Sequence, residues 1–153
     1  MRAGYAVSRV GRESQVPRLF KRGKDEFVPD FMVRKAVERP DSDRPLHRLI
    51  PIEVKYRYDL ARFLRGEAAH FFEAAKQWPD LCLILVTDRP EGGRSCFQVL
   101  QRTDESARTT TDLERVAVLD IYPSTVVEYA HLATKLFSLL VGPRGTQSKI
   151  RVG

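Results

Sequence analysis

The clearest pattern of hydrophobic and polar positions in the chain runs from Leu46 to Tyr58. Side chains there alternate between apolar and polar with a period of two residues, as they do in a strand that buries one face. The other face is therefore solvated or functional. The apolar face comprises Ile50, Ile52, Val54 and Tyr56, and the second face comprises Pro51, Glu53, Lys55 and Arg57.

The segment after this strand changes to a helical period. Apolar residues recur at three- and four-residue spacing between Leu60 and Ala75, which predicts an amphipathic helix. Asp59 is suited to cap its N-terminus, and Pro79 is expected to stop it. The continuous apolar run from Leu81 to Thr87 then predicts a strand that is covered on both faces.

The residues before the alternating strand predict a β-hairpin. Extended stretches at Val16–Lys21 and Phe27–Val33 flank a turn signal at Arg22–Lys24. Pro29 marks an edge or a bulge rather than a regular central position. The residues before Val16 show no clear period, so a short helix and a frayed terminus are both compatible with them.

The C-terminal half predicts two further strands and a helix. The strands are expected at Cys96–Leu100 and Val116–Tyr122, with the polar stretch Gln101–Leu113 between them as an exposed excursion. Ser124 is suited to cap the last helix, and Gly142-Pro143 is expected to end it. The apolar stripe of this helix comprises Val127, Ala130, Phe137, Leu140 and Val141.

This order of elements predicts an α/β fold, a mixed β-sheet flanked by helices. A chain of 153 residues is expected to form one domain, which we place at residues 1–143. Residues 144–153 are expected to form a basic, flexible tail. No apolar run approaches the roughly 18 to 20 residues of a membrane span, and the N-terminus lacks the apolar core of a signal peptide. We therefore expect a cytoplasmic protein that does not contact membranes.

The formal net charge of the chain is +6, with a sequence pI near 9.6. A basic balance favours polyanionic partners such as nucleic acids through long-range attraction. The two cysteines, Cys82 and Cys96, are far apart and form no CxxC pair, so they do not indicate a zinc site. Charge supports a function only together with a specific site.

Two short motifs could form such a site. Pro29-Asp30 lies in the predicted hairpin, and Glu53-Val54-Lys55 lies in the alternating strand. Glu53 follows Asp30 by 23 positions. Carboxylates are the ligands that Mg²⁺ takes in proteins, and a bound divalent cation stabilises the charge that develops when water attacks a phosphodiester. Alternation places Lys55 on the face of Glu53. Alternatively, Glu53 and Lys55 form a solvated charge face and Asp30 is a turn residue.

These motifs and their order resemble the PD-(D/E)xK nuclease superfamily, which includes restriction-endonuclease-like and Holliday junction resolvase-like phosphodiesterases. The resemblance covers about Val16 to Thr87. It implies a metal-dependent endonuclease in which Asp30, Glu53 and the backbone carbonyl of Val54 bind the metal. It also implies that Lys55 orients or activates the attacking water. The expected cofactor is Mg²⁺, for which Mn²⁺ can substitute, and the expected substrate is DNA rather than RNA.

Members of this superfamily usually place a helix before the hairpin, often with another acidic residue near the metal. Glu13 is the acidic residue in that part of the chain, and Glu26 lies nearer Asp30. Each could be a peripheral metal ligand or a surface carboxylate. A site with one metal ion and a site with two are therefore both compatible with the sequence.

Three arginines and a tyrosine are further candidates for nucleic-acid binding. Arg57 continues the face of Glu53 and Lys55, while Arg62 and Arg65 lie on the polar side of the predicted helix. They could contact phosphates or could be solvated surface residues. Tyr58 could stack on a base or cover the start of the helix.

Other functions compatible with the sequence are a catalytically silent nuclease-fold subunit that binds or scaffolds DNA, and a ligand-binding or interaction domain. The DNA could be branched or belong to a mobile element. A homodimer would place two sites on opposed strands, and a larger nuclease complex is the alternative. The apolar stripe of the last helix could form the dimer interface or pack on its own sheet.

Overall fold

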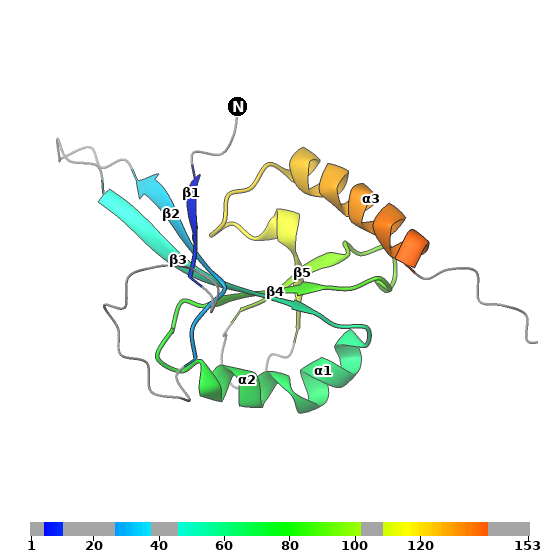
Figure 1. Ribbon diagram of the computed structural model, residues 1–153, viewed down its shortest axis with the longest axis horizontal. Coiled ribbons are helices and arrows are strands. Elements are labelled where there is room, and N and C mark those ends of the chain that lie inside the picture. Colours follow the sequence, from blue (N-terminus) through cyan, green and yellow to red (C-terminus); the bar gives the residue numbers. More distant parts are fainter. Residues whose placement is uncertain (1–4, 11–26, 38–45, 102–108, 141–153) are drawn as a thin grey trace, which may run out of the picture.

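The computed structural model describes residues 5–10, 27–37, 46–101 and 109–140. This part of the chain forms an α/β fold, an open, mixed sheet of six strands with helices on both faces (Figure 1). The strands lie in the sheet in their sequence order. They are β1 (Tyr5–Arg9), β2 (Phe31–Val37), β3 (Leu46–Tyr56), β4 (Cys82–Val86), β5 (Phe97–Gln101) and β6 (Thr111–Asp112).

Neighbouring strands pair antiparallel, except that β3 and β4 are parallel. A parallel pair requires a crossover connection, which is supplied here by α1 (Leu60–Gly66) and α2 (Ala68–Ala74). Both helices lie on the same side of the sheet (Figure 1). As a result, the C-terminal ends of β3 and β4 meet at one edge of the sheet.

The predicted helix after β3 is confirmed, but it is divided into two at Gly66 and Glu67. Asp59 caps it as expected, because its side chain accepts a hydrogen bond from the Arg62 backbone N–H at 2.8 Å. The Glu67 N–H still donates to the Phe63 carbonyl at 2.9 Å, so the backbone ladder bends rather than stops. Glycine has little helical preference, and it sits where the bend occurs.

Two apolar clusters hold the sheet between its helices. The cluster on the α1–α2 face comprises Phe63, Ala68, Leu83, Leu85 and Leu100. The cluster on the opposite face comprises Val33, Ile50, Ile52, Cys82, Val99, Val116 and Leu119.

The opposite face is covered by a 3₁₀ helix, η1 (Leu113–Arg115), the irregular segment after it, and α3 (Pro123–Leu140) (Figure 1). The predicted stripe of α3 is wrong at its ends, since Val127 and Leu140 are 48% and 81% exposed. Val126 is buried instead. Val141 lies outside the described residues. The side chains that face inward are Val126, Ala130, Ala133 and Phe137, and the exposed apolar ones include Tyr129, Leu132, Leu136, Leu139 and Leu140.

The predicted strand at Val116–Tyr122 is wrong. Val116 and Leu119 are buried, but they anchor a turn against the sheet, and the Leu119 N–H donates to the Val116 carbonyl at 3.1 Å. Asp120 has a positive φ of 43°, which ends any extended conformation. The last strand is instead Thr111–Asp112, at the end of the stretch predicted as an excursion.

The N-terminal prediction also changes. Tyr5–Arg9, for which the sequence shows no period, forms strand β1 and pairs with β2. Both neighbours of β2 are thus occupied, by β1 and β3, and the predicted partner Val16–Lys21 lies outside the described residues. Pro29 is buried and immediately precedes Asp30 and β2.

The predicted tail, residues 144–153, also falls outside the described part of the chain. Within the described ranges, no helix has the length and apolar character needed to cross a membrane.

Candidate active site on strand β3

The β2–β3 register brings Asp30 and Glu53 together. Phe31 pairs with Ile52 in this antiparallel ladder, so the residue before β2 lies opposite the residue after Ile52. The Asp30 backbone N–H donates to Glu53 Oε2 at 3.1 Å. Two carboxylates separated by 23 positions in sequence therefore lie in adjacent places on the sheet.

Asp30 also reaches the backbone of the next residue on β3. Its Oδ2 accepts a hydrogen bond from the Val54 N–H at 3.0 Å. The N–H and C=O of one strand residue point to the same neighbour, so the Val54 carbonyl points toward the Asp30 side as well. In the same register its partner would be Pro29, which has no N–H to donate. The proline of the motif thus leaves this carbonyl without its ladder hydrogen bond from β2.

Lys55 lies beside Glu53, as the alternation predicts. Its Nζ donates to Glu53 Oε1 at 2.8 Å and lies 5.2 Å from the centroid of the Phe71 ring on α2. Glu53 is buried, whereas about a quarter of the Lys55 side chain is accessible, at 26%. The ammonium group is therefore held by a charge-assisted hydrogen bond and an aromatic face, and it still reaches solvent.

The segment that carries Asp30 is hydrogen-bonded to residues that follow α2. The Phe27 carbonyl accepts hydrogen bonds from Gln77 Nε2 at 2.9 Å and from Trp78 Nε1 at 3.2 Å. The Phe27 ring packs edge-on against Phe71, with 5.4 Å between centroids. Phe71 therefore contacts both the segment before Asp30 and the Lys55 ammonium. It links the part of the site that carries Asp30 to the part that carries Lys55.

Arg57, a predicted phosphate contact, is engaged elsewhere. Its guanidinium lies 3.5 Å from Glu67 Oε2 and donates to the Tyr56 carbonyl at 2.8 Å. It also stacks over Phe63 at 4.9 Å. Arg57 thus stabilises the junction of α1 and α2, and its ion pair is with Glu67 rather than with a carboxylate of the site. Arg62 and Arg65 are exposed on α1, as predicted.

The donor set suits a hard divalent cation. Two carboxylates and a backbone carbonyl are the oxygen ligands that Mg²⁺ prefers. Among the residues that the structure describes, no group of three or more His, Cys, Asp or Glu side chains could hold a metal. The predicted peripheral acids, Glu13 and Glu26, lie outside the described residues.

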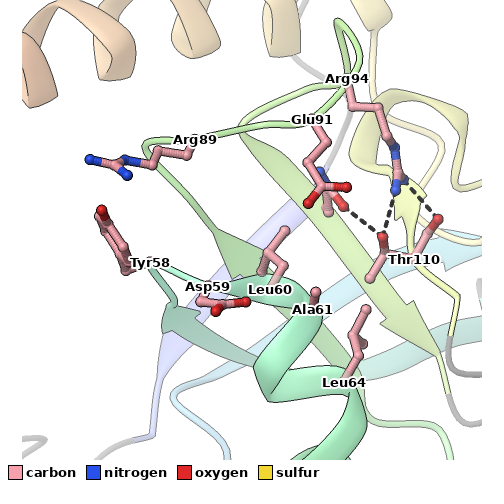
Figure 2. Close-up of a pocket in the computed structure, with 10 residues that line it drawn as sticks. Tyr58, Asp59, Leu60, Ala61, Leu64, Arg89, Glu91, Arg94 and Thr110 are labelled. Carbon is pink, nitrogen blue, oxygen red and sulfur yellow. Dashed lines mark hydrogen bonds between the residues drawn. The ribbon is translucent and has the colours of Figure 1, made fainter.

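A cavity of about 390 Å³ lies at the end of the same strand, beyond Lys55 (Figure 2). It contains none of the three motif side chains. Apart from Tyr58 and the helix cap Asp59, none of its polar residues carries a signal in the sequence, because they come from separate loops and strands. The cavity is lined by Tyr58, Asp59, Leu60, Ala61, Leu64, Arg89, Glu91, Arg94, Gln98 and Thr110.

Comparison with known proteins finds no family model, no curated protein and no solved structure that matches this chain.

Proposed function

We propose that the protein is a metal-dependent nuclease of the PD-(D/E)xK type that hydrolyses phosphodiester bonds, in DNA rather than RNA. The observation that carries this proposal is the contact between Asp30 and Glu53, with Lys55 bonded to the second carboxylate. If these residues were only exposed charges on the surface of a strand, they would not need to contact one another, because each could be solvated separately.

The chain's own groups have distinct tasks in this reaction. Asp30, Glu53 and the Val54 carbonyl would hold Mg²⁺ or Mn²⁺, which supplies charge stabilisation and a water of lowered pKa. Lys55 places a positive charge beside the carboxylates, where it can orient the attacking water and attract the phosphate. Phe71 restricts the position of the Lys55 ammonium. Glu53, which accepts from Lys55, would thus contact both the cation and the lysine.

The order of elements also supports a restriction-endonuclease-like fold. Asp30 precedes one strand of an antiparallel pair, Glu53 and Lys55 lie on the next, and helices then lead to the buried strand β4. This is the order that the resemblance implies. We place the protein in the cytoplasm, with DNA as its partner.

One observation favours a second role, as a nuclease-fold subunit that binds or scaffolds DNA in a dimer or larger complex. Large apolar side chains are exposed along α3, with Leu136 and Leu139 at 60% and 77%. Patches of this kind mark protein interfaces. Such a subunit could lack catalytic activity.

The test is a cleavage assay on supercoiled, linear and branched DNA with Mg²⁺, Mn²⁺ or EDTA. Asp30→Asn and Lys55→Ala are each expected to lower the rate by a factor of about 100 or more, since they remove transition-state charge stabilisation worth several kcal/mol. Asp80→Asn and Lys76→Ala change exposed residues of the same types and serve as matched controls. Circular dichroism verifies that all four variants are folded.

Cleavage that persists in EDTA, or that Asp30→Asn and Lys55→Ala leave unchanged, would contradict the proposal. Salt-sensitive DNA binding without cleavage, indifferent to both substitutions, would indicate the scaffold role instead.

A further inference from the structure

The cavity beyond β3 lies at a place where open α/β sheets commonly bind ligands. Tyr58 follows the C-terminal end of β3, and Arg89 follows the C-terminal end of the parallel strand β4. Crevices outside the carboxyl ends of parallel strands are typical binding sites in such sheets. A volume of about 390 Å³ is within the range of small-ligand sites.

One wall of the cavity offers an aromatic ring and a cation. The Arg89 guanidinium lies 4.2 Å from the centroid of the Tyr58 ring, and both side chains are largely accessible. Figure 2 shows the two next to each other, on the side of the cavity away from Arg94 and Thr110. The neighbouring floor is apolar and is formed by the first turns of α1, with Leu60, Ala61 and Leu64. A planar, partly apolar ligand with an anionic group fits this wall.

The opposite wall is a fixed polar network. Arg94 Nη1 donates to Thr110 Oγ1 at 2.9 Å, and Thr110 Oγ1 donates to Gln98 Oε1 at 2.6 Å. Arg94 also donates through Nε to Asp112 Oδ1 at 3.1 Å and through Nη2 to the Thr110 carbonyl at 2.7 Å. Gln98 is only 2% exposed, so this wall is preformed. Glu91 adds an exposed carboxylate directed toward the cavity (Figure 2), an acceptor suited to an amino group on a base.

The cavity and the candidate active site share one face of the sheet. Lys55 pairs with Leu85, and Leu85 pairs with Gln98, so the three side chains emerge on the same side. Tyr58 follows Lys55 by three residues, a span of about 10 Å in extended chain. A nucleic-acid strand rises about 3.4 Å per stacked nucleotide, so a strand bound at Lys55 reaches Tyr58 within about three nucleotides.

We propose that this cavity binds a single nucleotide, with its base against Tyr58 and the apolar floor and its phosphate on Arg89. If the nucleotide is part of the substrate strand, the cavity is a substrate subsite, and this assignment rests on the proposed nuclease function. A free nucleotide presents the same base and phosphate and is the other source of this ligand. Base stacking on Tyr58 gives affinity without requiring a particular sequence.

The experiment measures binding in EDTA, where cleavage does not interfere. The probes are a fluorescent single-stranded oligonucleotide, the same strand with one abasic position, and adenosine 5′-monophosphate. Tyr58→Ala and Arg89→Ala are each expected to weaken binding of the intact strand about tenfold. Tyr122→Ala and Arg115→Ala are the controls, because Tyr122 is 48% exposed against 50% for Tyr58 and Arg115 is exposed like Arg89.

The outcomes separate this proposal from the nuclease itself. Lys55→Ala is expected to lose cleavage and keep nucleotide binding. If the unsubstituted protein cleaves no DNA with Mg²⁺ or Mn²⁺ but its binding is still weakened by Tyr58→Ala, the result supports the cavity proposal and contradicts the nuclease. Tight binding of the mononucleotide identifies a free ligand, whereas binding of the strand alone, weakened by the abasic position, identifies a substrate subsite. If Tyr58→Ala and Arg89→Ala bind every probe as the controls do, the cavity proposal is wrong even where cleavage is metal-dependent.

Discussion

The two faces of the sheet differ in what they bury. The face under α3 is packed by apolar side chains, such as Ile52 and Val99. The face under α1 and α2 buries Leu83, Leu85 and Leu100 and also the polar residues Glu53, Gln98 and Asp112. Adjacent residues of one strand serve opposite faces, because side chains alternate. One sheet therefore separates a stabilising face from a face that can carry chemistry.

Burying polar groups is costly unless each finds a partner. Every one of these three has a partner in the structure: Glu53 accepts from Lys55, Gln98 from Thr110, and Asp112 from Arg94. The polar face thus avoids the desolvation cost while keeping charged and hydrogen-bonding groups in fixed positions. The difference between the faces predicts that substitutions on them affect different properties.

The largest expected effect is on stability, from the apolar face. Ile52→Ala should lower the free energy of unfolding by about 2 to 5 kcal/mol, because it removes buried methyl groups and leaves a cavity. Val7→Ala, on the 61% exposed Val7, should change it by less than about 0.5 kcal/mol. Urea unfolding followed by circular dichroism measures both. Equal losses for the two variants would show that this face does not form the core.

A second effect of the apolar face depends on pH. Burial raises the pKa of the Cys82 thiol from 9.0 to about 11. Between these values the unfolded chain ionises and the folded chain does not, so the free energy of unfolding falls as the pH rises through this window, by about 3 kcal/mol. The contribution is fully present below pH 9. Burial raises the pKa of Cys96 as well, which adds to the slope.

Urea unfolding at several pH values between about 8 and 11 measures this slope. Cys82→Ala should make it shallower, because the variant has no thiol to ionise at that position. An unchanged slope in Cys82→Ala would mean that the thiol is already accessible in the folded chain.

The smallest expected effect is on the cleavage rate, and it tests the role of the polar face. Phe71→Leu keeps an apolar side chain but removes the ring under the Lys55 ammonium, an interaction worth about 0.5 to 1 kcal/mol. If the protein is the proposed nuclease, its cleavage rate should fall about two- to fivefold. Phe72→Leu, at the next and equally half-buried position, is the control. Identical cleavage rates for both variants would show that Phe71 does not position Lys55.

The elements that the sequence predicts well are those with one clear period. The strand that contains Glu53 and the buried run around Leu83 were located to within two residues, because alternation and continuous burial each indicate one structure. The segment from Val116 to Tyr122 was misassigned, since its apolar residues anchor a turn and their spacing also fits a strand. Strand β1 has four exposed residues of five, so its pairing with β2 leaves no pattern in the sequence.

The sequence singles out the three motif residues because their types and spacing are themselves a signal. Their supporting contacts were not predictable in this way. Gln77 bonds to the Phe27 carbonyl across 50 positions, and Arg94 bonds to Thr110 across 16. Such contacts depend on the tertiary arrangement, and no periodicity in the chain encodes them. The cavity at Tyr58 is of the same kind, because its walls come from four separate segments.

The β2–β3 register has a consequence for how the motif varies. Asp30 and Glu53 meet at the open end of an antiparallel pair, which extends away from them to Val37 and Leu46, the end where the chain connects the two strands. Lengthening both strands at the far end adds residues between Asp30 and Glu53 in the sequence and leaves the hydrogen bond from the Asp30 N–H to the Glu53 carboxylate unchanged. The separation of 23 positions therefore measures the length of a hairpin rather than the geometry of a site. A chain with a different spacing could keep the same arrangement, and insertions between Val37 and Leu46 should be well tolerated.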